Sequence, residues 1–68
     1  MLNGFKKSRL VAGLTQIELA EKLGVSVVSI HNWEIGRNLP KVKRLKHVAE
    51  ILNTTVEDLL DFDERRTG

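Results

Sequence analysis

The chain has 68 residues, contains no cysteine and carries a formal net charge of +2 at neutral pH. This length allows one small domain, and the lack of cysteine excludes disulfides and thiolate zinc sites. No apolar run approaches the roughly 20 residues of a membrane helix, and the N-terminal residues lack the apolar segment of a signal peptide. We therefore expect one cytoplasmic domain over residues 1–68, with its core at about 5–60.

Charged residues are distributed unevenly along the chain. Residues 1–46 contain nine Lys or Arg and three Glu, a balance of +6, whereas residues 47–68 contain two Arg and six acids, a balance of −4. This polarity favours a protein that turns its basic side towards a polyanion. We expect residues 61–68 to form an acidic, flexible C-terminal tail that faces away from that partner.

Five segments show apolar residues at helical spacing, and the first four are followed by a residue type that tolerates the left-handed backbone conformation. Those four residues are Gly13, Gly24, Gly36 and Asn53. The expected helices span about 3–12, 16–23, 27–35, 41–52 and 56–61. The sequence therefore predicts an all-α fold, a compact five-helix bundle.

The second and third predicted helices are joined by a very short connection. Thr15 and Glu18 predict a capping box at the start of the second helix. Ser26 predicts the N-cap of the third helix, only two residues after Gly24. A connection this short forces the two helices to cross steeply, which is the helix-turn-helix geometry.

The residues expected in the core share the inner stripes of the five helices. They are Phe5, Leu14, Ile17, Leu19, Ala20, Leu23, Val25, Ile30, Trp33, Val42, Leu45, Val48, Ala49, Leu52, Val56, Leu59 and Leu60. Beside this core, Glu34 is the only acid placed to meet Arg9. We expect these two residues to form a partly buried ion pair that joins the first helix to the third.

The third helix keeps one stripe away from the core, because Ile30 and Trp33 point inward. Exposing two adjacent valines on that stripe has no benefit for folding. In a DNA major groove, a valine methyl packs against the 5-methyl of thymine, and an asparagine binds N6 and N7 of adenine. The expected base contacts are Val27, Val28, Ser29, His31 and Asn32. The two valines also fit a protein–protein interface.

A second set of residues is expected to contact phosphate. The start of the second helix offers free backbone N–H groups and the positive end of the helix dipole. The start of the fourth helix is crowded with cations, which are unfavourable there unless an anion neutralises them. The expected phosphate contacts are Thr15, Gln16, Ser26, Arg37, Lys41, Lys43 and Arg44.

Catalytic and metal-binding arrangements are not evident in the sequence. His31 and His47 have no nearby carboxylate cluster, so we expect no metal ion and no cofactor. We expect His47 to be a half-buried structural residue or a helix-surface residue. The chain also lacks a Ser, His and Asp constellation and has no paired carboxylates of an active-site pocket. Both observations argue against an enzyme.

The run GLTQIELAEKLGVS…I..WE.GR..P resembles the Cro/C1-type (Xre) helix-turn-helix domain of phage and bacterial repressors, over nearly the whole chain from about Phe5 to Leu60. The resemblance implies a lambda-repressor-like bundle, in which the second and third helices form the helix-turn-helix, bound to operator DNA as a two-fold dimer. It assigns base contacts to the positions of Val27, Val28, Ser29 and Asn32. It assigns a contact with phosphate or with a base at the edge of the half-site to the position of Gln16. It assigns DNA-backbone contacts to those of Arg37, Lys41 and Lys43, and the internal ion pair to those of Arg9 and Glu34.

The two valines depart from this family pattern. Family members usually carry Gln, Arg, Ser or Thr at the positions of Val27 and Val28. We therefore expect fewer direct hydrogen bonds to bases in this protein, and a larger contribution from readout of DNA shape.

We therefore expect a sequence-specific transcriptional regulator of double-stranded DNA, with the helix at 27–35 in the major groove. It is expected in a bacterial cell, in association with the nucleoid, as a compact Cro-like protein or as an excised DNA-binding domain. Leu60 and Phe62 are the candidate contacts of a weak homodimer that is completed on DNA. The alternative is a protein-binding helix-turn-helix module, such as an antirepressor or an antitoxin subunit, that contacts its partner through Val27 and Val28.

Overall fold

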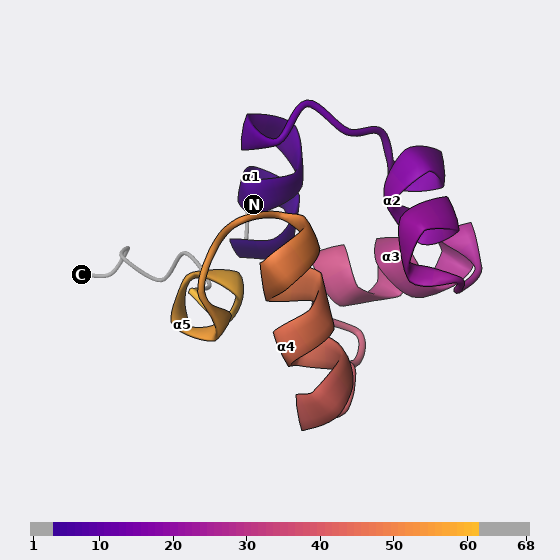
Figure 1. The fold of residues 1–68 in the computed structure, drawn as a ribbon. Coiled ribbons are helices and arrows are strands. Elements are labelled where there is room, and N and C mark those ends of the chain that lie inside the picture. The colour runs from indigo at the N-terminus through magenta and orange to yellow at the C-terminus, as the bar shows by residue number, and fades with distance from the viewer. Residues whose placement is uncertain (1–3, 62–68) are drawn as a thin grey trace.

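The computed structural model describes residues 4–61, which form five helices and contain no strand (Figure 1). The helices are α1 (Gly4–Val11), α2 (Gln16–Leu23), α3 (Val27–Glu34), α4 (Val42–Ile51) and α5 (Val56–Leu59). Every helix begins and ends within two residues of its predicted bounds. The predicted all-α, five-helix fold is confirmed. None of these helices has the length and apolarity needed to span a bilayer.

The predicted caps define the connection between α2 and α3. Thr15 and Glu18 form the capping box, because the Thr15 hydroxyl accepts from the Glu18 N–H at 3.0 Å and the Thr15 N–H donates to the Glu18 carboxylate at 2.8 Å. Gly24 ends α2 in the left-handed conformation, with φ of 74°. Ser26 then caps α3 by accepting the Ser29 N–H at 3.2 Å. These caps allow α3 to start four residues after α2 ends.

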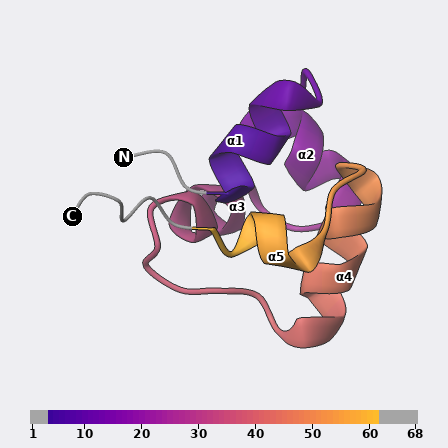
Figure 2. The same cartoon turned by 90° about the vertical axis from the view of Figure 1, so that its left-hand side faces the viewer.

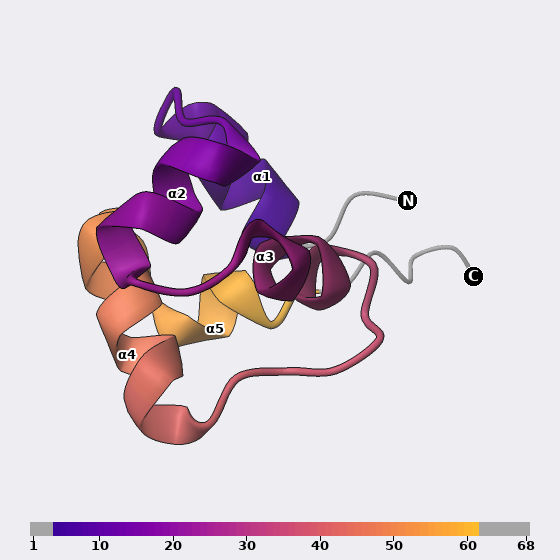
Figure 3. The same ribbon diagram turned by 90° about the vertical axis from the view of Figure 1, so that its right-hand side faces the viewer.

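The helices pack around one apolar core. Helix α2 packs on α3 and α4, whereas α1 packs on α3 and α5 (Figures 2 and 3). A long segment leads from the end of α3 to the start of α4 along the outside of the bundle (Figure 3). The fully buried side chains are Phe5, Leu19, Ile30, Val48 and Leu59.

The contact between α1 and α5 depends on a residue without a side chain. A Cβ atom at Gly4 would lie 1.8 Å from the backbone carbonyl oxygen of Asp58. Because that oxygen belongs to the backbone, any larger residue would force the two helices apart. Gly4 therefore sets how closely α5 closes the bundle, a role that the sequence pattern did not indicate.

Three residues expected in the core lie on the surface. Ile17 is 61% exposed, because Leu19, Ala20 and Leu23 form the inner stripe of α2 and Ile17 lies roughly 200° around the helix from Leu19.

Val42 is 67% exposed, since it is the first residue of α4, at the end that extends beyond the bundle (Figure 1). Leu60 follows α5 and is 37% exposed. The predictions that Ile17, Val42 and Leu60 are core residues were therefore wrong. Leu14, Val25 and Val56 are partly buried and pack against the core.

Candidate nucleic-acid interface

Helix α3 has one buried face and one open face. Ile30 and Trp33 are buried, whereas Val27, Val28 and His31 are exposed. Asn32 and Ser29 are half-buried at the edges of the open face. All five residues expected to contact bases therefore lie outside the core. The Ser29 hydroxyl lies 3.2 Å from the Ser26 hydroxyl, so these two side chains share a hydrogen bond at the start of the helix.

One flank of α3 is formed by the ion pair expected from the sequence. The Arg9 guanidinium binds both carboxylate oxygens of Glu34, through Nε to Oε2 and through Nη2 to Oε1 at 3.1 Å. A third donor, Nη1, binds the backbone carbonyl of Leu14 at 2.9 Å. Both charged side chains are buried. The pair therefore holds α1, the segment before α2 and the end of α3 together.

Gln16 joins the same cluster. Its side-chain Nε2 donates to Glu34 Oε1 at 3.0 Å, whereas the sequence predicted only a DNA contact for Gln16. The two residues are 18 positions apart, so no local pattern could indicate the contact. The Gln16 amide, in the first turn of α2, is therefore held by a hydrogen bond to the buried carboxylate of Glu34.

The other flank of α3 is the start of α4. Lys41 is the N-cap residue of α4 and makes no side-chain capping bond, and the first turn of this helix contains no acid. Lys41 and Lys43 are exposed. Cations at this end of a helix oppose its dipole, so the arrangement does not serve the stability of α4.

Arg44 has a structural contact that the sequence did not predict. Its Nη1 donates to the backbone carbonyl of Leu23 at 2.9 Å, and the side chain is half-buried. Helix α2 ends at Leu23, where carbonyl groups lack helical partners. Arg44 therefore joins α4 to the end of α2, a structural role in addition to the phosphate contact expected from the sequence.

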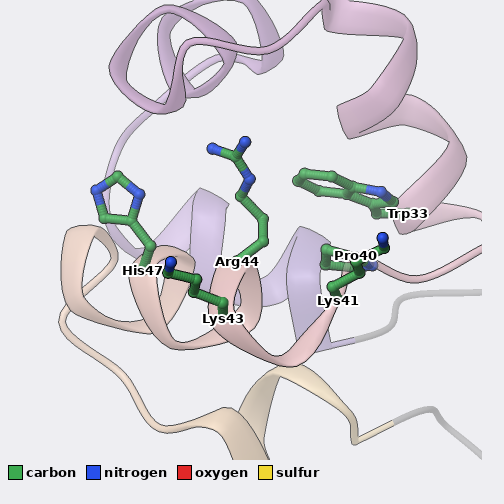
Figure 4. A pocket seen from close by; sticks show the side chains of 6 residues that line it. All are labelled: Trp33, Pro40, Lys41, Lys43, Arg44 and His47. Carbon is green, nitrogen blue, oxygen red and sulfur yellow. The ribbon is translucent and has the colours of Figure 1, made fainter.

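A basic cleft of about 620 Å³ lies between α3 and α4 (Figure 4). The cleft is lined by Trp33, Pro40, Lys41, Lys43, Arg44 and His47, none of which is acidic. Trp33 comes from α3, whereas Lys43, Arg44 and His47 come from one side of α4 (Figure 4). His47 was expected to be a helix-surface or half-buried structural residue. Its position four residues after Lys43 is the signal that would have placed it with the basic residues.

The open face of α3 thus lies between two flanks with donors. Trp33 faces the basic cleft at α4, while the next residue, Glu34, faces Arg9 and Gln16. Thr15 and Gln16 lie at the start of α2, and Lys41 and Lys43 lie at the start of α4. An exposed helix between two groups of donors is the shape that fits a groove bordered by two phosphate strands. Among residues 4–61, no cluster of His, Cys, Asp or Glu is arranged to hold a metal ion.

The chain matches a known family over most of its length. The helix-turn-helix family model HTH_3 matches residues 5–59. The chain belongs to the Cro/C1-type (Xre) helix-turn-helix family. Xre-family proteins are DNA-binding transcriptional regulators and are not enzymes, which confirms the predicted class.

The relatives of this Xre-family chain include a transcriptional activator and a transcriptional repressor. It is 39% identical over 51 residues to the HTH-type transcriptional activator BcrR of Enterococcus faecalis, a match that covers 75% of this chain and 25% of the activator. It is 34% identical over 64 residues to an uncharacterized HTH-type transcriptional regulator of Archaeoglobus fulgidus, covering 94% of this chain and 91% of that protein.

A third relative is the cryptic phage CTXphi transcriptional repressor RstR of Vibrio cholerae, with 31% identity over 45 residues. That match covers 66% of this chain and 40% of the repressor. The chain spans a quarter of the length of BcrR, but most of the length of the archaeal regulator. No solved structure matches the chain at comparable significance.

Proposed function

We propose that this protein binds a specific operator in double-stranded DNA as a two-fold dimer and regulates transcription there. The observation that carries the proposal is the contrast across α3, where Val28 is 61% exposed and Ile30 is 1% exposed. The helix is fixed by its inner side and offers its outer side to a ligand. Operator binding would place the protein in the bacterial cytoplasm, on the nucleoid.

In this proposal the outer side of α3 enters the major groove. Val27 and Val28 pack against thymine methyl groups, and Asn32 binds adenine through its amide. His31, on the same exposed face, reaches a base edge beside them, and Ser29 contributes its hydroxyl at the edge of the face. Two valines discriminate thymine by its methyl group alone, so the shape of the operator carries part of the specificity.

The flanks of α3 position the helix by contacting phosphates. Thr15 and Gln16 approach one strand with the N-terminus of α2. The other strand is contacted by the basic residues at the cleft and by two residues at the ends of α3. These contacts are Lys41, Lys43, Arg44, Ser26 and Arg37. Because Arg44 already binds the backbone carbonyl of Leu23, we expect its phosphate contact to contribute less than those of the lysines.

The dimer contact is proposed at the end of the described chain. Leu60 is partly exposed next to α5, which supports its role in self-association. Phe62, the second candidate, lies outside residues 4–61. Two α3 helices that enter successive major grooves must lie roughly 34 Å apart, one turn of the duplex. So small an apolar contact predicts a weak dimer that is completed on DNA.

Selection of binding sites from random-sequence duplexes tests this proposal. The enriched sites are expected to contain two inverted half-sites with centres about 10 base pairs apart. Sedimentation should then show two chains on a duplex with both half-sites, and mainly monomer without DNA. Enrichment of a single unrepeated site would refute the dimer, and no enrichment at all would refute sequence-specific binding.

A further inference from the structure

The amide of Gln16 is anchored on one side only. Its Nε2 donates one hydrogen bond to the buried carboxylate of Glu34 at 3.0 Å. A primary amide carries two N–H donors on this nitrogen. Among the residues that the structure describes, none accepts the second N–H of Gln16. Gln16 is the first residue of α2 and is only half-buried, so part of this residue is open to solvent where the helix begins.

A phosphate can use only one end of such an amide. Phosphate oxygens accept hydrogen bonds, so the N–H₂ end of Gln16 binds them, whereas the carbonyl end repels them. Without an anchor the amide can rotate and present either end. An ionised carboxylate is also acceptor-only, so Glu34 selects the same end of the amide that a phosphate requires.

We propose that Glu34 is a positioning residue for DNA binding, which orients the Gln16 amide so that its second N–H donates to a backbone phosphate. The inference rests on the proposed function, because it needs a phosphate at the start of α2. It gives the buried pair of Arg9 and Glu34 a part in DNA binding in addition to its part in the fold. Holding a donor ready in this way reduces the entropy lost when the contact forms.

Arg9 removes the objection that Glu34 itself is negatively charged. Its guanidinium binds both oxygens of the Glu34 carboxylate, so the negative charge is neutralised within the cluster. The same guanidinium binds the carbonyl of Leu14, two residues before Gln16. Arg9 therefore holds the backbone just before Gln16, while Glu34 holds the Gln16 side chain.

Neutralising Glu34 changes the affinity for DNA in opposite directions under the two explanations. Affinity falls if Glu34 positions Gln16, and rises if Glu34 acts only through its negative charge. Removing an acid from a DNA-binding surface ordinarily strengthens binding. Glu34→Gln is instead expected to weaken operator binding about fivefold, the ratio that roughly 1 kcal/mol of lost hydrogen bonding produces. Glu21→Gln, which neutralises an exposed acid on α2, is the matched control and should leave affinity unchanged or raise it. Binding is measured where circular dichroism shows every variant to be folded.

A double-mutant cycle then assigns the effect to Gln16. If Glu34 acts through Gln16, then Glu34→Gln has no further effect on affinity once Gln16→Ala is present. Equal losses with and without Gln16→Ala would overturn the positioning role and leave Glu34 a structural residue only. Failure of the wild-type protein to bind any duplex would overturn the proposed function itself, a result distinct from both.

The wild-type protein supplies a test that needs no variant to fold. Gln16 is the only glutamine in the chain, so its side-chain amide signals are unambiguous by NMR. One of its two N–H protons is expected to exchange with water more slowly than those of Asn38, an exposed amide in the segment between α3 and α4. Equal exchange of both Gln16 protons and the Asn38 protons would show that Glu34 does not hold the amide.

Discussion

Replacing Arg9 by alanine is expected to destabilise the protein by about 3–5 kcal/mol, because it leaves the Glu34 carboxylate buried without its cation. Glu34 is 5% exposed, so water cannot replace the lost donors. A 68-residue domain has a total unfolding free energy of roughly 3–10 kcal/mol. Loss of Arg9 thus removes a large share of the stability, and urea unfolding followed by circular dichroism measures it.

Two further variants distinguish the cost of a buried, unpaired charge from the effect of losing any cation from α1. Lys7→Ala removes an exposed cation from the same helix and should change stability by less than about 0.5 kcal/mol. Arg9→Met combined with Glu34→Leu removes both charges and should cost less than Arg9→Ala alone. If Arg9→Ala unfolded at the same urea concentration as Lys7→Ala, the pair would have no stabilising role.

Raising the salt concentration from 50 to 200 mM is expected to weaken binding to duplex DNA by about a thousandfold. The reason is the release of counterions when about six phosphates are neutralised by the protein. Fluorescence anisotropy with a labelled duplex gives the slope of log affinity against log salt. Lys43→Ala, at the start of α4, should reduce this slope by about one for each chain bound to the duplex.

The salt experiment also distinguishes DNA binding from the alternative function, a protein-binding helix-turn-helix module. A partner protein held by the exposed methyl groups of Val27 and Val28 would bind with little dependence on salt, because apolar contacts are not screened. Lys7 lines a pocket together with Asp58 and Asp61 and is not among the proposed phosphate contacts, so Lys7→Ala is the control that should leave the slope unchanged. A flat salt response for the wild-type protein would contradict phosphate binding and favour the protein-binding module.

Local features of the structure could be predicted from the sequence, because they depend on neighbours in the chain. Thr15 and Glu18 are three residues apart, so their capping box is determined within one helical turn. The left-handed residues likewise mark helix ends without reference to the rest of the fold. The inner face of α3 followed from the spacing of Ile30 and Trp33.

Contacts between helices could not be predicted in the same way. The bonds of Gln16 to Glu34 and of Arg44 to Leu23 join residues 18 and 21 positions apart. They depend on crossing angles that helical spacing does not contain. Ile17 was misplaced because apolar residues lie on both sides of α2, and their spacing alone does not show that Leu19, Ala20 and Leu23 form the side that faces the core. The base and phosphate contacts themselves remain proposals from the shape and charge of the surface.

The most direct test of an α3 helix that contacts bases compares Asn32→Ala with Lys43→Ala on a selected operator and on random duplex DNA. Asn32→Ala is expected to cost about 1–3 kcal/mol on the operator and almost nothing on random DNA, whereas Lys43→Ala should weaken both alike. If Asn32→Ala instead reduced affinity equally on the two duplexes, Asn32 would not contact a base, and α3 would not be the helix that distinguishes the operator.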